Sequence, residues 1–376
     1  MNIIKLLGIE YKEDIISNLL VAFIKKSESF KKEFIENLIG IDFNEITDLD
    51  ISIRTKTSVG IPDIVLYINT RNKSKLVVIE NKLKAKEGVN QTLRYSDKQC
   101  IKELLEKSKL ILYKDNVEFI GLFLTLVPER NYTGEVFKNI TYKDILNKIE
   151  CKIEDRTLDK LYRDFREVLN EFYNNLDVDC NESILEIFKK ETDAERAIIK
   201  FTKIIKSINL NNGLIIDDID KINGRGRNSF FVKISKDLWK GSKKAELIKG
   251  KYSVNEETYD IHLEFTFDSK NKNIALPLHY ETNPYIPHNE LLEKSEAENY
   301  AKYHNRRERI KINIHDEIKK HNYSNIKPYN GTNQIAKIII DLDEKTTVKE
   351  FVDNIGKEII KLSEIVDGSI IKECRS

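Results

Sequence analysis

Two short apolar runs joined by a polar turn constrain the fold of this 376-residue chain more than any other feature. Residues 63–68 (DIVLYI) and 76–83 (LVVIENKL) are rich in β-branched side chains, and a polar segment separates them. This pattern predicts a β-hairpin. Farther along, residues 117–127 (VEFIGLFLTLV) are almost entirely apolar, which is typical of a strand that is buried on both faces. Together these runs predict an α/β fold in which helices flank a mixed sheet.

Helical periodicity surrounds these strands. The predicted helices of this half and of the segment after it cover residues 10–26, 28–38, 87–107, 142–149, 155–175 and 182–207, and a further strand covers 50–56. The composition changes near residue 209, where NLNNG is loop-like. We therefore predict a mixed α/β domain over residues 1–178, a helical connector over 179–208 and an α+β domain over 209–376.

The last third of the chain alternates apolar and polar residues in several segments. We predict strands at 229–234, 245–254, 258–267, 275–281 and 336–343. Two segments with helical spacing, 289–321 and 346–365, are predicted to be helices. This order of elements predicts a second α+β domain that supplies substrate binding, specificity or contact with a partner.

Composition excludes several classes of protein. The formal net charge is +1, so any basic surface must be a local patch. The four cysteines are scattered and none forms a C-x-x-C pair, which argues against a zinc ribbon and predicts a cytoplasmic protein. No apolar run approaches the length that spans a membrane, and no phosphate-binding loop of the GxxxxGK[ST] type is present.

Polar residues at the ends of the predicted hairpin point to chemistry. Asp63 begins the first strand, and Glu80 and Lys82 are two residues apart on the second, so they share a face. A carboxylate buried alone at the end of an apolar strand would be costly, and Asp63 can provide a neighbour. The two carboxylates, with the backbone carbonyl of Asn81, are oxygen ligands of the kind that Mg²⁺ or Mn²⁺ takes. The alternative is an ordinary ion pair between neighbouring strands.

Such a metal site suits hydrolysis of a phosphodiester bond, because the metal lowers the pKa of a bound water and neutralises phosphate charge. Lys82 can orient that water and stabilise negative charge, or accept a proton if its pKa is depressed. Gln91 and Tyr95 are four residues apart on the following helix and share a face, where they can contact a phosphate. The alternatives are a solvated Gln91 and a Tyr95 that packs in the core.

Three motifs in this order resemble those of the PD-(D/E)xK nuclease superfamily. They are Gly60-Ile61-Pro62-Asp63, Glu80-Asn81-Lys82 and Gln91-x-x-x-Tyr95, the last of which is similar to the RecB-like branch. The resemblance covers roughly residues 10–150 and implies a restriction-endonuclease-like core with the order α-β-β-β-α-β. It also implies an acid on the opening helix, which maps to Glu13 with Asp14 as the rival. Glu13 would bind metal or support it, unless it is only a first-turn acid that the helix dipole favours.

The resemblance further implies a Mg²⁺- or Mn²⁺-dependent deoxyribonuclease, with a role in restriction or in antiviral defence against phage. Two rivals stay open: a ribonuclease, and a nuclease fold that serves only as a nucleic-acid-binding or assembly module. A salt-sensitive binder without metal-dependent turnover would identify the module. Cutting both strands of DNA would favour a homodimer, and activity through a partner protein is a further alternative.

The second domain contains a basic stretch. Residues 225–251 contain nine lysines or arginines against two acids, with one tryptophan among them. Basic residues interleaved with an aromatic are typical of a nucleic-acid surface, and a solvated face is the alternative. The predicted nucleic-acid contacts are Tyr95 in the first domain and Arg225, Arg227, Trp239, Lys243 and Lys244 in the second. A second basic candidate, with the same alternative, is the run Arg306, Arg307, Arg309 and Lys311.

All six histidines lie at position 262 or later. Their spacing matches no zinc-binding pattern, so we predict scattered structural roles for them.

Overall fold

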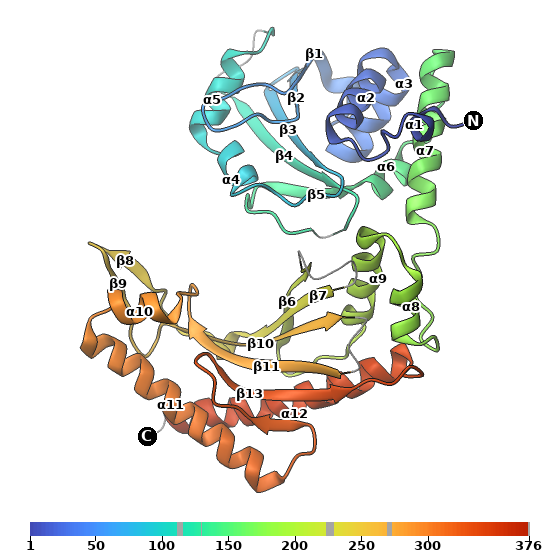
Figure 1. Cartoon of the computed structure of the whole chain (residues 1–376). Coiled ribbons are helices and arrows are strands. Elements are labelled where there is room, and N and C mark those ends of the chain that lie inside the picture. The colour runs from blue at the N-terminus through green and yellow to red at the C-terminus, as the bar shows by residue number, and fades with distance from the viewer. Residues whose placement is uncertain (111–115, 129, 223–228, 269–272, 375–376) are drawn as a thin grey trace. The chain divides into compact units, whose positions relative to one another are not determined.

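The fold was analysed in a computed structural model of the chain (Figure 1). It describes residues 1–110, 116–128, 130–222, 229–268 and 273–374. The chain divides into two compact units, Met1–Leu176 and Asp177–Ser376. Each unit combines a sheet with helices, so the predicted mixture of helices and strands is confirmed.

The first unit is built on a mixed sheet with the order β1-β2-β3-β4-β5. Its strands are β1 (Ile46–Ile53), β2 (Ile64–Thr70), β3 (Ser74–Lys82), β4 (Val117–Thr125) and β5 (Phe137–Thr141). The first three run antiparallel to one another, whereas β4 is parallel to β3 and β5 is parallel to β4. The predicted hairpin and the apolar strand are therefore confirmed, and β3 is central, with every residue of β2 and most residues of β3 buried.

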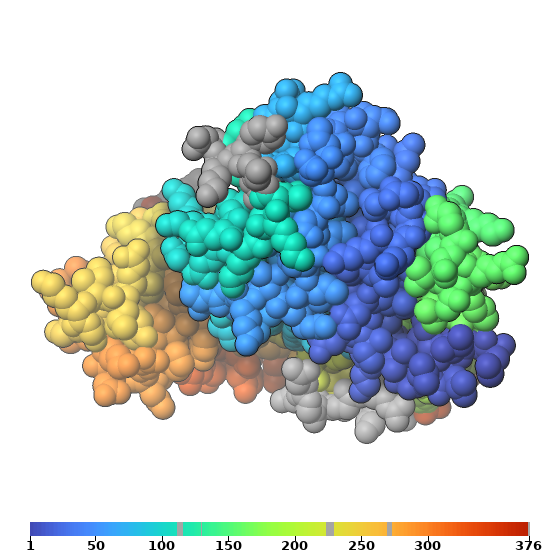
Figure 2. Space-filling model, turned by 90° about the horizontal axis from the view of Figure 1, so that it is seen from above, coloured from blue at the N-terminus to red at the C-terminus, as the bar shows by residue number. Residues whose placement is uncertain are grey.

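Helices cover both faces of this sheet (Figure 1). On one face lie α4 (Gln91–Tyr95) and α5 (Lys98–Glu106), whose side chains join Val65, Leu76 and Val78 in one buried cluster. The other face carries α2 (Glu13–Lys26) and α6 (Tyr142–Lys148). The remaining helices of this unit are α1 (Ile3–Leu6), α3 (Glu28–Glu33), η1 (Phe34–Ile39), η2 (Phe43–Glu45) and α7 (Arg156–Tyr173). Figure 2 shows the turquoise α5 and the green α7 on opposite sides of the blue N-terminal elements.

Two of the predicted helices are each made of two helical segments. The predicted helix over 87–107 is two helices, because Asp97 is extended and its carboxylate caps the start of α5. The predicted helix over 28–38 continues from α3 into a π-helical turn, η1. The strand β5 and the short helix α1 were not predicted from the sequence.

The second unit contains an antiparallel sheet with the order β12-β13-β11-β10-β7-β6. Its strands are β6 (Leu214–Lys221), β7 (Ser229–Lys236), β10 (Tyr259–Asp268), β11 (Asn273–Thr282), β12 (Ile326–Pro328) and β13 (Gln334–Asp341). The predicted single strand over 245–254 is instead a hairpin of β8 (Glu246–Ile248) and β9 (Lys251–Ser253). Lys249 and Gly250 both have positive φ, 49° and 81°, which suits a tight two-residue turn.

One face of this sheet is covered by helices, as Figure 1 shows. They include α8 (Ile184–Lys190), α9 (Ala194–Lys206), α10 (His288–Lys294), α11 (Ala297–His321) and α12 (Val348–Cys374), and the short η3 (Asp237–Trp239) follows β7. The rings of Phe188 and Phe201 stack against Phe230 and Phe267 of the sheet. The predicted connector over 179–208 is therefore not separate, because its helices form part of the core of the second unit.

Two further predicted helices are divided. The segment 182–207 breaks before Asp193, whose side chain caps α9, and the segment 289–321 breaks at Ser295, which is extended. In the part of the chain that the structure describes, no helix is both long and apolar enough to cross a membrane.

Candidate active site

The β2–β3 hairpin brings Asp63 and Glu80 together. Asp63 directly precedes β2, and Ile64 pairs with Ile79, so the same register places Asp63 opposite Glu80. Residues opposite each other in an antiparallel pair project from the same face. The backbone N–H of Asn81 donates a 2.9 Å hydrogen bond to Oδ2 of Asp63, which fixes this carboxylate beside the end of β3.

Glu80 and Lys82 project together from β3, as their spacing predicts. Nζ of Lys82 lies 2.7 Å from Oε1 of Glu80, and both side chains are largely removed from solvent. Glu80 has no exposed surface, and neither of its oxygens accepts a hydrogen bond of acceptable geometry. A carboxylate in this state keeps lone pairs free inside the protein, which is costly unless a cation or a proton satisfies them.

The electrostatics of the site follow from burial and from crowding of like charges. Burial, reinforced by the charge of Asp63, raises the pKa of Glu80 to about 8, although Lys82 opposes the shift. Burial also raises the pKa of Asp63, against the hydrogen bond from Asn81. For Lys82 burial acts to lower the pKa, but Glu80 and Asp63 outweigh it and the pKa is raised. Lys82 therefore keeps its proton and does not meet the condition for a general base.

The opening helix adds one of its two candidate acids to this cluster. Oε1 of Glu13 accepts a 3.0 Å hydrogen bond from the backbone N–H of Leu83, and Oε2 lies 3.9 Å from Nζ of Lys82. Asp14 instead faces Arg54 at 3.5 Å and is mostly exposed. The structure thus brings Glu13, and not Asp14, to the candidate site.

Asn81 points away from its two neighbours on β3. Its side chain donates a 2.9 Å hydrogen bond to Oγ of Ser17 and accepts one of 2.7 Å from the hydroxyl of Tyr142. These partners belong to α2 and α6, on the face opposite to Glu80. Any contribution of Asn81 to a metal site must therefore come from its backbone carbonyl.

Gln91 and Tyr95 form a pair beside the site. Nε2 of Gln91 donates a 2.9 Å hydrogen bond to the hydroxyl of Tyr95, and the backbone N–H of Gly88 donates to Oε1 of Gln91 over 3.1 Å. Tyr95 is only 1% exposed and belongs to the buried cluster under α4 and α5. The prediction that Tyr95 contacts nucleic acid is therefore corrected, because its ring has no free face.

The carboxylates suit a hard divalent cation. Glu80 offers two buried oxygens without hydrogen bonds, and Asp63 and Glu13 each add oxygens from neighbouring elements. Mg²⁺ and Mn²⁺ prefer such oxygen ligands and complete their coordination with water. The donor atoms of this site are therefore of the kind that the predicted metal takes.

The residues of the second unit that were predicted to contact nucleic acid do not all lie on its surface. Arg225 and Arg227 lie outside the described residues. Trp239 has no exposed surface, and its Nε1 donates a 2.8 Å hydrogen bond to Asp367, so it is a core residue that has no face for a base. Lys243 is exposed but forms an ion pair with Glu257, and Lys244 is exposed.

The second basic candidate is also largely internal. Arg306 and Arg307 are 9% and 6% exposed. Arg306 is paired with Glu373 at 3.0 Å, and Arg307 donates a 2.8 Å hydrogen bond to the carbonyl of Gly331. These two arginines stabilise the second unit and leave only part of the run on the surface.

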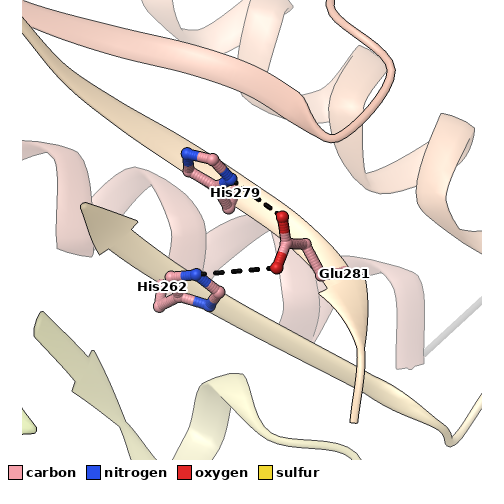
Figure 3. A group of neighbouring side chains, drawn as sticks. All are labelled: His262, His279 and Glu281. Atoms are coloured by element: carbon pink, nitrogen blue, oxygen red, sulfur yellow. Dashed lines mark hydrogen bonds and ion pairs between the residues drawn. The ribbon is translucent and has the colours of Figure 1, made fainter. Parts of the chain in front are cut away.

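Sequence reasoning missed one cluster of potential ligands. His262 and His279 lie opposite each other on β10 and β11, and Glu281 reaches toward both (Figure 3). The signals in the sequence are that His279 and Glu281 are two apart on one strand, and that Asp260, His262 and Glu264 alternate in the same way on another. That His262 lies beside His279 depends on the register between β10 and β11, and the spacing of residues in the sequence does not reveal this register.

Comparisons with family models, with curated proteins and with solved structures gave no match. The case for a function therefore rests on the residues of the candidate site.

Proposed function

We propose that the first unit is a metal-dependent nuclease that hydrolyses phosphodiester bonds in DNA. The observation that carries this proposal is the buried Glu80 carboxylate, which lacks hydrogen bonds, lies opposite Asp63 in the strand register and is 2.7 Å from Lys82. A mere ion pair would leave half of this carboxylate unsatisfied in the interior. A cation held by both acids would satisfy it.

The order of elements supports the proposal. The helix α2 precedes the three antiparallel strands, α4 and α5 follow, and β4 then pairs parallel to β3. The resemblance to PD-(D/E)xK nucleases implies this order, α-β-β-β-α-β. The positions of the motif residues add support, since Asp63 directly precedes β2 and Glu80 and Lys82 lie at the end of β3.

Each side chain has a part in the proposed reaction. Asp63, Glu80 and the carbonyl of Asn81 would hold Mg²⁺ or Mn²⁺, with support from Glu13. A metal bound there would make a water molecule more acidic and neutralise charge on the phosphate under attack. Lys82, which stays protonated, orients the attacking water and stabilises the negative charge that develops on the phosphate. Gln91 positions the loop at Gly88 and the hydroxyl of Tyr95 beside these charged side chains, through one hydrogen bond to each.

Digestion assays test the proposal. The substrates are linear and circular DNA, single- and double-stranded, and RNA, each with Mg²⁺, Mn²⁺ or EDTA. We expect cutting of DNA that requires metal and falls by at least about 100-fold in Lys82→Ala and Glu80→Gln. Lys75→Ala is the matched control, because Lys75 is also on β3 and is paired with a carboxylate, Glu118 at 3.1 Å, remote from the site.

Other outcomes point to the rivals. Cutting of RNA alone would mean that the protein is a ribonuclease, with the same proposed metal site. Salt-sensitive binding of DNA without turnover would identify a binding or assembly module. Equal cutting by wild type and both variants would reduce Glu80 and Lys82 to a structural ion pair. A role in restriction or defence against phage is the biological setting that we propose by analogy with the resemblance.

A further inference from the structure

Two adjacent strands of the second unit place two imidazoles and a carboxylate together (Figure 3). His262 of β10 lies opposite His279 of β11, and Glu281 lies two residues beyond His279 on the same face. The two rings are nearly parallel, with centroids 5.3 Å apart. One potential ligand atom from each of the three residues lies within 4.8 Å of the other two.

The distances within this cluster are close to those of a metal site. Nδ1 of His279 lies 3.0 Å from Oε1 of Glu281, and Nε2 of His262 lies 3.9 Å from Oε2 of the same carboxylate. A tetrahedral Zn²⁺ with ligands at about 2.0–2.1 Å separates them by about 3.3–3.4 Å. The two observed distances lie on either side of this value, and all three ligand atoms lie within 4.8 Å of one another. Glu264 lies within reach as a fourth ligand, since its Oε1 is 3.1 Å from Nε2 of His262.

The nitrogens on the far side of each ring support the same interpretation. Nδ1 of His262 faces Oδ2 of Asp260 at 3.4 Å, and Nε2 of His279 faces Oε2 of Glu264 at 3.7 Å. Both nitrogens are buried and neither has a hydrogen-bond partner. A histidine that ligates a metal usually donates its other N–H to a carboxylate, and both rings are placed to do so.

Charge also favours a divalent cation. Among the described residues, the ion pairs of this cluster set the carboxylates of Asp260, Glu264 and Glu281 against Lys233, which leaves a formal charge of −2 if the rings are neutral. A bound divalent ion would neutralise this charge. Glu281 also lines a cavity of about 190 Å³, which brings this one ligand next to space that water or an ion can enter.

We propose that His262, His279 and Glu281 form a second metal site, selective for a divalent ion that prefers imidazole, specifically Zn²⁺, with Glu264 or water in the remaining position. This site differs in chemistry from the oxygen-only site of the first unit. It does not depend on the proposed nuclease activity, and its test has no catalytic readout.

The test is calorimetric titration of the full chain with Zn²⁺, after removal of bound metal with EDTA, in millimolar Mg²⁺ that occupies the oxygen-rich site. We expect one strong site per chain. Glu281→Gln and His279→Gln should weaken it by more than about 100-fold, because even loss of a residue behind a ligand costs about 10–100-fold. Asp260→Asn should weaken Zn²⁺ binding by about 10–100-fold, because Asp260 lies behind the ligand His262. His321→Gln, at the exposed end of α11, is the matched control and should bind as wild type does.

A second measurement on wild type alone guards against variants that fail to fold. Co²⁺ in a site of two imidazoles and one or two carboxylates, with low coordination number, gives intense visible absorption, whereas octahedral oxygen coordination gives weak absorption. Intense bands that Zn²⁺ displaces support the site. Absence of strong Zn²⁺ binding by wild type, or equal binding by Glu281→Gln and His279→Gln, would overturn it and leave a network of ion pairs between protonated histidines and carboxylates.

Discussion

The hydroxyl of Tyr142 donates a 2.7 Å hydrogen bond to Oδ1 of Asn81, on the face of β3 opposite to Glu80. Both residues are fully buried. Because Asn81 also bonds Ser17 of α2, the middle residue of the motif strand connects β3 to two helices. The Asn81 side chain therefore anchors the end of β3, which carries Glu80 and Lys82, to the helices on the opposite face of the sheet.

Removal of this hydroxyl should destabilise the first unit. Tyr142→Phe leaves Oδ1 of Asn81 buried without its donor, which should lower the free energy of unfolding by about 1–3 kcal/mol. Urea denaturation followed by circular dichroism measures the change. Tyr285→Phe is the control, because Tyr285 is 56% exposed and should unfold like wild type. A Tyr142→Phe protein as stable as wild type would show that the hydrogen bond contributes nothing.

The metal-free protein should lose stability as the pH rises toward 8. Burial raises the pKa of Glu80 from 4.5 to about 8, so the folded chain keeps a proton that the unfolded chain releases. The resulting stability is fully present below the unfolded pKa and is lost as the pH rises through the folded pKa. In EDTA, the melting temperature should fall by at least about 2–4 °C between pH 6 and pH 8, the effect of about 1 kcal/mol in a unit of this size.

The variant Glu80→Gln isolates this effect, since its side chain is neutral at every pH. Its melting temperature should depend less on pH than that of wild type, and the difference between the two proteins is the quantity to compare. Parallel curves for the two proteins would mean that Glu80 does not titrate in this range.

Gly60 should tolerate no side chain. Its φ is +154°, and a Cβ there would lie 2.8 Å from Cε1 of Tyr95, which is packed in the core. We expect Gly60→Ala to cost about 1–3 kcal/mol, measured by denaturation, and to reduce cutting because the displaced segment carries Asp63. Gly368→Ala is the control: no atom lies within 4 Å of the added Cβ, and alanine favours the helix by about 1 kcal/mol. Equal stability of the two variants would contradict the prediction.

Fluorescence can establish that Trp239 is a core residue. The chain has a single tryptophan, and Trp239 has no exposed surface. Its emission should be that of a buried indole and should not change when DNA or RNA is added. Trp239→Phe should lower stability by about 1–3 kcal/mol through loss of the bond to Asp367, and should leave nucleic-acid affinity unchanged. Saturable quenching of the Trp239 fluorescence by DNA would instead support the predicted role of Trp239 as a nucleic-acid contact.

The hairpin and its polar face were predictable because both depend on local pattern. Glu80 and Lys82 share a face through the period of a strand, and the apolar flanks define β2 and β3. The strand β5 was not predictable, since FKNIT has no strong periodicity and is ordered by parallel pairing with β4. The division of a predicted helix at Asp97 has a different and local cause, because its side chain caps the backbone N–H of Gln99 and begins a new helix there.

The histidine cluster and Trp239 show what spacing alone does not reveal. His262 and His279 meet only because β10 and β11 pair in one register, and a shift of one residue would put His262 beside a core residue. Trp239 lies in a basic stretch, and its burial depends on Asp367 far away in α12. Local composition predicts a surface there, whereas tertiary packing decides otherwise.

The parallel pairing of β3 with β4 sets the time at which the candidate active site can form. All residues of the candidate active site precede β4 in the chain: Glu13, Asp63, Glu80, Lys82 and Gln91. The strand that carries two of them is nevertheless paired along β4, as far as Lys82 with Thr125, the last residue of β4. While the protein is being synthesised, β3 remains an open edge until Thr125 has left the ribosome. A chain released before that point carries every residue of the candidate active site and lacks the strand that pairs with β3 at Glu80.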